Sequence, residues 1–131
     1  MAAAETYPDD LKYHEEHDWA RVDGDEAVLG ITWFAADALG ELVHYEAPSV
    51  GSSVTKNESY GEVESVKAVS DLVAPLSGEV LEVNAAVVDA PETVNQDPYG
   101  AGWLIRIRLS DPGEADSLLD PAAYRDVVAA Q

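Results

Sequence analysis

The sequence predicts a mainly β domain of the sandwich or barrel type, with short helices between and after the strands. Short β-prone runs recur along the chain and are punctuated by Gly, Pro, Asn and Asp. They do not alternate with long helical patterns, so a βαβ sheet is not expected. The chain has 131 residues, the length of one domain that buries a sizeable core. A weak internal repeat relates residues 54–58 to residues 77–84, which favours two small sheets around one core.

The first part of the chain predicts a loose arm followed by a hairpin. Residues 1–10 are small and polar and end in Pro8-Asp9-Asp10, so we expect a flexible arm before a single domain over 11–131. Residues 11–13 are expected to be extended. An alternating run over 17–22, the turn signal Asp23-Gly24 and a returning run over 26–31 predict two paired strands.

A short helix is expected between Thr32 and Gly40. Thr32 is a favourable N-cap, and Gly40 is a typical residue just after a helix C-terminus. The apolar residues between them recur at helical spacing, which predicts one buried face. That face comprises Phe34, Ala35, Ala38 and Leu39.

The remaining elements follow from the same turn and period signals. Strands are expected over 42–45, from 54, on both sides of Lys67, and over 79–84. One helical turn is expected over 90–95, with Pro91 at its first position. A short helix should end at residues 118–119. Asp120-Pro121 should cap a last helix whose Tyr124, Val127 and Val128 face inward.

The clearest strand is the run over 103–109. Its two faces differ in character, as expected of a strand with one buried side. One face carries Trp103, Ile105, Ile107 and Leu109, and the other carries Arg106 and Arg108.

Composition excludes several classes of function. Seven basic residues against 26 acidic ones give a net charge of −19. Such a surface repels nucleic acid and anionic membranes, and it favours partners with basic docking faces. The alternative interpretation is that the acidity only prevents aggregation. The chain contains no cysteine, so disulfides and thiolate chemistry are impossible. Residues 1–5 are too short and too acidic for a signal peptide, and no apolar run is long enough to span a membrane.

No set of residues predicts catalysis or metal binding. His14-Glu15-Glu16-His17 lacks the His-Glu-x-x-His spacing, and a strand would place its two histidines on opposite faces. His17 and Asp18 are the one acid–base pair in the sequence, and strand neighbours also face apart. A Gly-rich phosphate loop and a Gly-x-Ser-x-Gly motif are both missing. We therefore expect a protein that is not itself an enzyme and holds no metal.

Lys67 is the remaining candidate for function. It lies between two β-prone runs, which predicts the tip of a hairpin in which Ser65 opposes Ala68 and Glu64 opposes Val69. An ordinary surface lysine is the alternative. Nearby carboxylates favour the charged ammonium, whereas a Schiff-base lysine must be neutral. A protruding lysine between small residues instead suits covalent attachment of a group by another enzyme.

Segments along the whole chain resemble the glycine cleavage system H protein. The resemblance covers roughly residues 11–128 and rests on the order of many short segments rather than on one motif. The segments are 17–19 (His-Asp-Trp), 30–32 (Gly-Ile-Thr), 39–41 (Leu-Gly-Glu), 48–51, 61–68, 70–71, 75–80, 82–84, 94–100 and 102–104.

The resemblance implies a cofactor and a fold. In this family the lysine of Glu-Ser-x-Lys-Ala carries lipoic acid as an amide, and by position that residue is Lys67. The implied fold is the barrel-sandwich hybrid of lipoyl domains, with two small antiparallel sheets, short flanking helices and a C-terminal helix. The Met-Lys-Met segment of biotin carriers is missing, which disfavours biotin. The residues expected to be recognised around the lysine are Glu62, Glu64, Ser65, Val66, Ala68 and Asp71.

The resemblance also implies a shuttle with defined partners. A pyridoxal-phosphate glycine decarboxylase loads an aminomethyl group onto lipoate, and a tetrahydrofolate-dependent aminomethyltransferase removes it. Dihydrolipoamide dehydrogenase reoxidises the dithiol, and a lipoate ligase or lipoyl transferase attaches the cofactor. An H-like protein that relays lipoyl groups to other proteins is the alternative. A bacterial cytoplasm is the expected location, with a processed mitochondrial form as the alternative.

In the family, the loaded arm folds into a cleft near the N-terminal His-Glu-Trp strand. The corresponding candidates in this chain are His17, Asp18, Trp19 and Phe34. Two departures affect this cleft. Asp18 is one methylene shorter than the usual Glu. Trp33-Phe34 follows Gly-Ile-Thr, where the family commonly has Asp, and should alter either the cleft wall or the docking of the helix.

Overall fold

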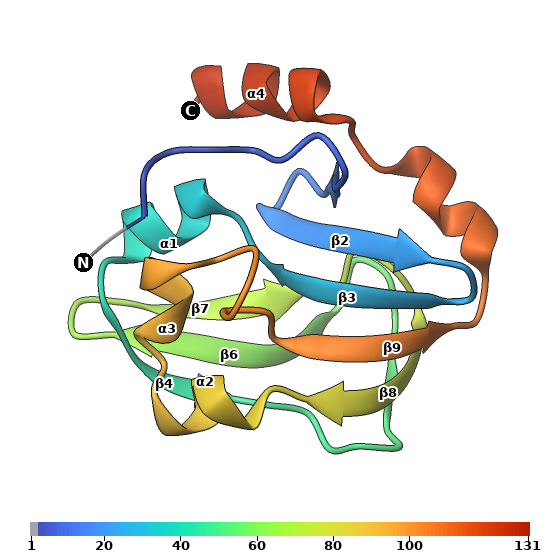
Figure 1. Ribbon diagram of the computed structural model, residues 1–131, viewed down its shortest axis with the longest axis horizontal. Coiled ribbons are helices and arrows are strands. Elements are labelled where there is room, and N and C mark those ends of the chain that lie inside the picture. Colours follow the sequence, from blue (N-terminus) through green and yellow to red (C-terminus); the bar gives the residue numbers. More distant parts are fainter. Residues whose placement is uncertain (1–2) are drawn as a thin grey trace.

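The computed structural model describes residues 3–131, which form two antiparallel sheets with short helices at their edges (Figure 1). The larger sheet has the strand order β1-β2-β3-β9-β8-β5, and the smaller has the order β4-β6-β7. The strands are β1 (Lys12–Tyr13), β2 (Asp18–Asp23), β3 (Glu26–Ile31), β4 (Leu42–Glu46), β5 (Ser53–Val54), β6 (Ser59–Ser65), β7 (Val69–Val73), β8 (Gly78–Val83) and β9 (Ile105–Leu109). The predicted β class with two small sheets is confirmed.

The β2–β3 hairpin forms where the turn signal predicts it. Asp23 pairs with Glu26, and Gly24 adopts a φ of +65°, which glycine tolerates best. Further along the same pair, Trp19 lies opposite Gly30. A Cβ at Gly30 would lie 2.6 Å from the Trp19 indole, so glycine is required for the ring to lie flat across the strand.

Helix α1 (Trp33–Leu39) has both predicted ends. The Thr32 hydroxyl accepts a hydrogen bond from the Ala35 N–H, and Gly40 ends the helix with its N–H bonded to the Ala36 carbonyl. The predicted face is partly wrong, because Ala36 is the buried residue and Ala38 is exposed. The helix is only two turns long, so the spacing of its apolar residues alone does not fix its buried side.

The other helices agree less uniformly with the sequence. Helix α2 (Ala85–Asp89), capped by Asn84, is not predicted, because its valines favour strands and it is only five residues long. Helix α3 (Thr93–Gln96) starts two residues after Pro91. The 3-10 helix η1 (Pro112–Ser117) and α4 (Pro121–Ala129) lie where expected, and Asp120 caps α4. None of these helices within residues 3–131 has the length and apolar character needed to cross a membrane.

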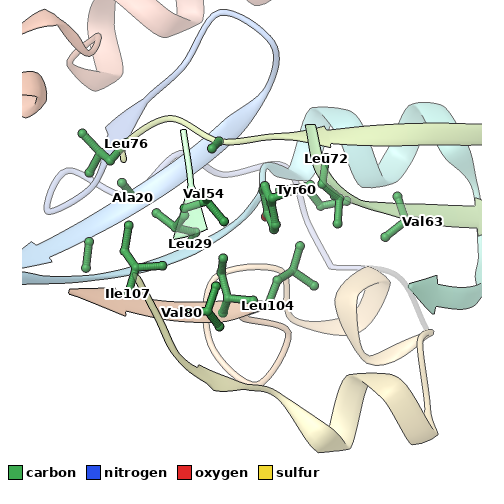
Figure 2. Close-up of a cluster of buried hydrophobic side chains, with 14 of the residues drawn as sticks. Ala20, Leu29, Val54, Tyr60, Val63, Leu72, Leu76, Val80, Leu104 and Ile107 are labelled. Carbon is green, nitrogen blue, oxygen red and sulfur yellow. The ribbon is translucent and has the colours of Figure 1, made fainter. Parts of the chain in front are cut away.

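The main core lies between the two sheets (Figure 2). β9 contributes Ile105, Ile107 and Leu109 to it, while Arg106 and Arg108 face outward as predicted. Trp103 lies before the strand begins and packs elsewhere. The labelled core residues in Figure 2 are Ala20, Leu29, Val54, Tyr60, Val63, Leu72, Leu76, Val80, Leu104 and Ile107.

A second, aromatic cluster joins the start of the chain to α4. Tyr13 stacks on Tyr124 at a ring separation of 4.8 Å, and Tyr7 meets Tyr124 edge-on at 5.4 Å. Tyr7 is 4% exposed, and the Arg125 guanidinium donates to its carbonyl. From Ala3 onward the expected loose arm is therefore packed along α1 and α4 in the structure, because its one aromatic residue completes this cluster.

Candidate functional site

Lys67 lies at the tip of the β6–β7 hairpin, as the sequence predicts. Glu64 pairs with Val69, and the Ser65 N–H donates to the Ala68 carbonyl at 2.8 Å, which confirms the predicted register. Val66, beside the lysine, is 89% exposed. The hairpin extends past the body of the molecule (Figure 1), so the Lys67 side chain is accessible to a large partner.

Ser65 fixes the shape of this turn. Two-residue hairpin loops usually need positive φ angles, yet neither Val66 nor Lys67 has one. Ser65 is buried, with 3% of its surface exposed. Its hydroxyl accepts hydrogen bonds from the N–H groups of Lys67 and Ala68, at 3.3 and 3.2 Å. It thereby satisfies two backbone donors that the sheet leaves free.

A row of carboxylates crosses the outer face of the smaller sheet beside the tip. Glu62 lies directly opposite Asp71 on β7 and opposite Glu46 on β4. Glu64 is exposed next to this row and pairs with His44 on β4. Like charges directly opposite one another destabilise a sheet. The row therefore lowers the stability of the smaller sheet, and it also presents negative charge near Lys67.

The stem of Lys67 lies over the end of α1. A Cβ built on Gly40 would lie 3.5 Å from Lys67 Cε and 3.9 Å from Nζ. Within residues 3–131 the ammonium makes no hydrogen bond and no salt bridge. The amine is therefore free for acylation without breaking an existing interaction.

Asp18 is a buried carboxylate with an unsatisfied oxygen. It is 2% exposed, and its Oδ2 has no hydrogen-bond partner in the described part of the chain. Burial raises the pKa of Asp18 well above its usual value, and the nearby N–H of Val73 acts in the opposite direction. Val73 lies at the base of the hairpin, opposite Ser59, so Asp18 is near the end of the hairpin remote from Lys67.

His17 and Phe34 lie side by side, with the His17 ring between α1 and α4. The His17 Nδ1 is 2.8 Å from the Tyr124 hydroxyl, which is 2.7 Å from the Thr32 hydroxyl. The His17 and Phe34 rings are 4.7 Å apart. Burial lowers the pKa of His17, which favours a neutral ring between α1 and α4.

Trp19 and Asp18 lie on opposite sides of β2, although both are cleft candidates. Successive residues of β2 face opposite sides, so Asp18 faces the main core with Ala20, while Trp19 enters the aromatic cluster. Trp19 is fully buried, and its Nε1 donates to the Pro98 carbonyl at 3.0 Å. It packs on the face of β2 opposite Asp18, so the two side chains line no common surface.

Trp33 affects helix docking rather than the neighbourhood of Asp18. Its indole N–H donates to the Ala3 carbonyl at 2.7 Å, and its backbone N–H donates to the Tyr99 hydroxyl at 2.8 Å. The aromatic residue that departs from the family pattern therefore holds the start of the chain against α1.

Two residues near the site were not singled out from the sequence. Tyr60 is buried beside Asp18, and its hydroxyl lacks a partner among the described residues. Asn95 bonds to both ends of the Gly40 turn. A polar residue within the Val94-Asn95-x-Asp97-Pro98 segment was the available signal for Asn95; nothing in the sequence distinguishes Tyr60 from any other strand tyrosine.

The histidines of the 14–17 segment point to different partners. His14 Nε2 is 2.6 Å from Asn57 Oδ1, whereas His17 reaches Tyr124. Across residues 3–131, no group of three or more His, Cys, Asp or Glu residues is placed to hold a metal ion.

Comparison with known proteins gives a consistent result. The family model described as "Glycine cleavage H-protein" matches residues 11–131. The glycine cleavage system H protein of Symbiobacterium thermophilum is 56% identical over 117 residues, which cover 89% of this chain and 91% of that protein. That of Myxococcus xanthus is 52% identical over 121 residues, covering 92% and 94%.

A solved structure agrees as well. The crystal structure of a glycine cleavage system H protein from Mycobacterium marinum has a TM-score of 0.87 and 43% sequence identity, and it covers 94% of this chain and 99% of that one. The likeness confirms the barrel-sandwich fold of two antiparallel sheets with a C-terminal helix. With a family match over nearly the whole chain and relatives above half identity, the chain belongs to the glycine cleavage H-protein family.

Proposed function

We propose that this protein is the lipoyl-carrying shuttle of a glycine cleavage system, with lipoic acid attached to Lys67 as an amide. The observation that carries the proposal is the exposed lysine at the tip of a protruding hairpin, with an amine that has no partner within residues 3–131, in a chain of this family. Lipoate, when attached, supplies a dithiolane that accepts and carries an aminomethyl group.

The hairpin fits the attachment of such a group. Ser65 holds the turn, so Lys67 is presented in a defined direction rather than on a mobile loop. Val66 and Ala68 leave room on both sides of the lysine, and the carboxylates of Glu62, Glu64 and Asp71 mark the approach. These residues are our proposed recognition surface for a lipoate ligase or lipoyl transferase.

The serial partners follow from the carrier role. We assign the loading step to a pyridoxal-phosphate glycine decarboxylase, the unloading step to a tetrahydrofolate-dependent aminomethyltransferase, and reoxidation to dihydrolipoamide dehydrogenase. The net charge of −19 supports fast encounter with basic docking faces on each. The chain acts as a carrier and not as a catalyst, and the bacterial relatives favour a bacterial cytoplasm.

Asp18 is our proposed acceptor for the ammonium of a loaded arm. The orphaned Oδ2 is a free acceptor, and its burial would strengthen an ion pair with an arriving cation. From Val69 at the tip to Val73 at the base the hairpin spans four residues, about 13 Å of strand. His17 and Phe34 would border the arm along α1, while Trp19 supports β2 from behind.

Attachment is tested by intact mass after expression in cells supplied with lipoate. The wild-type chain should gain one lipoyl group, and Lys67→Arg should gain none while keeping its melting temperature. Equal modification of Lys67→Arg would disprove the assignment.

Carrier activity is tested with the cognate decarboxylase, by following exchange of labelled bicarbonate into glycine. The lipoylated wild type should support exchange. A lipoylated protein that fails this assay would instead be a relay of lipoyl groups to other proteins.

A further inference from the structure

The turn after α1 forms a platform under the stem of Lys67. Gly40 has φ +84° and ψ −169°, a backbone conformation that is essentially restricted to glycine. The missing side chain is on the side of Lys67, since a Cβ there would contact Lys67 Cε at 3.5 Å. Gly40 thus combines a conformation that favours glycine with a position directly beside the attachment lysine.

Asn95 of α3 holds this turn in place from three directions. Its Nδ2 donates to the Gly40 carbonyl at 2.8 Å and to the Ala36 carbonyl at 3.4 Å. Its Oδ1 accepts a hydrogen bond from the Leu42 N–H at 2.9 Å. One side chain therefore satisfies backbone groups before, at and after Gly40, and links the end of α1 to the start of β4.

The platform has little other support on the side of α3. A pocket of about 230 Å³ opens there between α1 and α3, and Gly40 and Asn95 both line it. Glu41, the next residue, is exposed. Leu39 and Leu42, on either side of the turn, pack into the main core. Side chains do not fill the space beside Gly40 itself, so the hydrogen bonds of Asn95 set the path of the backbone between these two anchors.

We propose that Asn95 is a positioning residue for the attachment site: it fixes the Gly40 turn, and the turn in turn restricts the stem of Lys67 so that the amine leaves the hairpin tip in one preferred direction. The inference rests on the proposed function for its purpose, although the restriction itself is a property of the unmodified chain. Asn95 makes no contact with the reacting amine, so its effect on acylation is indirect.

The restriction can be measured directly because the chain has only three lysines, Lys12, Lys56 and Lys67. With lysine labelled with ¹³C at Cε, the protein should give three resolvable signals, and relaxation reports the mobility of each. In the wild type, the Lys67 stem should be more ordered than that of exposed Lys12. Asn95→Ala should reduce the order at Lys67 to the level of Lys12 and leave Lys12 and Lys56 unchanged.

Asn84→Ala is a matched control. Asn84 makes the same number of hydrogen bonds, two donated to the carbonyls of Ala101 and Trp103 and one accepted from the Ala86 N–H, at the end of β8. Its loss should lower stability by a similar amount without changing Lys67. If Asn95→Ala does not fold, Gly40→Ala tests the same platform, because alanine would be strained at the φ of +84° and the turn would have to shift beneath Lys67.

A second readout is the kinetics of acylation by a lipoate ligase. Misplacement of a nucleophile by about 1 Å can cost up to about a hundredfold in rate, so we expect Asn95→Ala to lower kcat about tenfold. KM should stay the same, because the surface of the hairpin is intact. Asn84→Ala should leave both unchanged.

Three results would overturn the inference: equal order of Lys67 and Lys12 in the wild type, no change of Lys67 in Asn95→Ala, or the same change in Asn84→Ala. None of these depends on lipoylation. Failure of the wild type to gain a lipoyl group would instead refute the proposed function and leave the measured restriction of Lys67 standing.

Discussion

At the scale of single residues, Asp18 is the position where the chain tolerates an unfavourable group. A fully buried carboxylate with a free oxygen lowers the stability of the fold once it ionises. Tyr60, buried next to it with an unpartnered hydroxyl, does not compensate for it, and burial raises the pKa of this phenol as well. Such costs persist at sites where another requirement, here the proposed binding of an ammonium, maintains the residue.

We predict that Asp18→Asn stabilises the unmodified protein at neutral pH. The folded-state pKa of Asp18 lies above its unfolded value of 3.8. The protonated group therefore favours folding below about pH 4, and this contribution is lost as pH rises through the folded-state pKa. The amide avoids the buried charge, so Asp18→Asn should gain about 1–3 kcal/mol in unfolding free energy at pH 7.5.

Urea unfolding at a series of pH values measures this difference. The two proteins should differ least near pH 3.5, and the gap should widen with rising pH. The other titrating groups are the same in both proteins. The difference between their unfolding free energies therefore reports the titration of Asp18. If the difference in unfolding free energy is constant across the pH range, Asp18 does not have the raised folded-state pKa that its burial predicts.

At the scale of elements, the β6–β7 hairpin combines a well-fixed turn with a repulsive flank. The Ser65 hydroxyl stabilises the turn, whereas the row of Glu46, Glu62 and Asp71 opposes the pairing of β4, β6 and β7. In the larger sheet, by contrast, Glu26, Glu79 and Glu82 each form an ion pair with an arginine. This distribution is expected if the carboxylates serve recognition and the turn preserves the geometry.

We predict that Glu62→Lys stabilises the fold. The new ammonium would lie directly opposite Asp71 and Glu46, and each cross-strand pair of opposite charge contributes roughly 0.2–1 kcal/mol. We expect a gain of about 1 kcal/mol in urea unfolding at low salt, together with slower lipoylation, because the recognition surface loses a carboxylate.

Asp116→Lys is the control, since it changes the net charge equally at an exposed position of η1. If it stabilises the protein as much as Glu62→Lys, the gain comes from net charge rather than from the row.

At the scale of the whole molecule, two separate cores stabilise the fold. The main core joins the two sheets, and the aromatic cluster fastens the start of the chain and α4 onto β1 and β2. Trp33 extends this fastening through its bond to Ala3. The attachment hairpin belongs to the smaller sheet, whereas β1 and β2, against which the aromatic cluster packs, belong to the larger one.

The net charge leads to a prediction for partner encounter. Exposed charges are screened over about 10 Å at 0.1 M salt and about 3 Å at 1 M. The apparent second-order rate of aminomethyl transfer from the decarboxylase should therefore fall as salt rises, while the rate at saturating carrier should change little. Stopped-flow measurements from low to high salt would test this. Rates that stay flat would remove electrostatic steering from the mechanism.

Elements whose signals are local could be predicted from the sequence. The register of the Lys67 hairpin, the β2–β3 turn and the caps of α1 and α4 are confirmed, because each depends on residues a few positions apart. Helix α2 and the buried side of α1 were missed, since short helices take their conformation from what they pack against.

The surroundings of Lys67, in contrast, depend on contacts between residues far apart in the sequence. The approach of the Lys67 stem to Gly40, the hydrogen bonds from Asn95 to the Gly40 turn and the hydrogen bond between His17 and Tyr124 join residues 27 to 107 positions apart. The same is true of the burial of Asp18 opposite the base of the hairpin. Local propensities carry no information about such contacts, because the packing of two sheets and two chain ends brings these residues together.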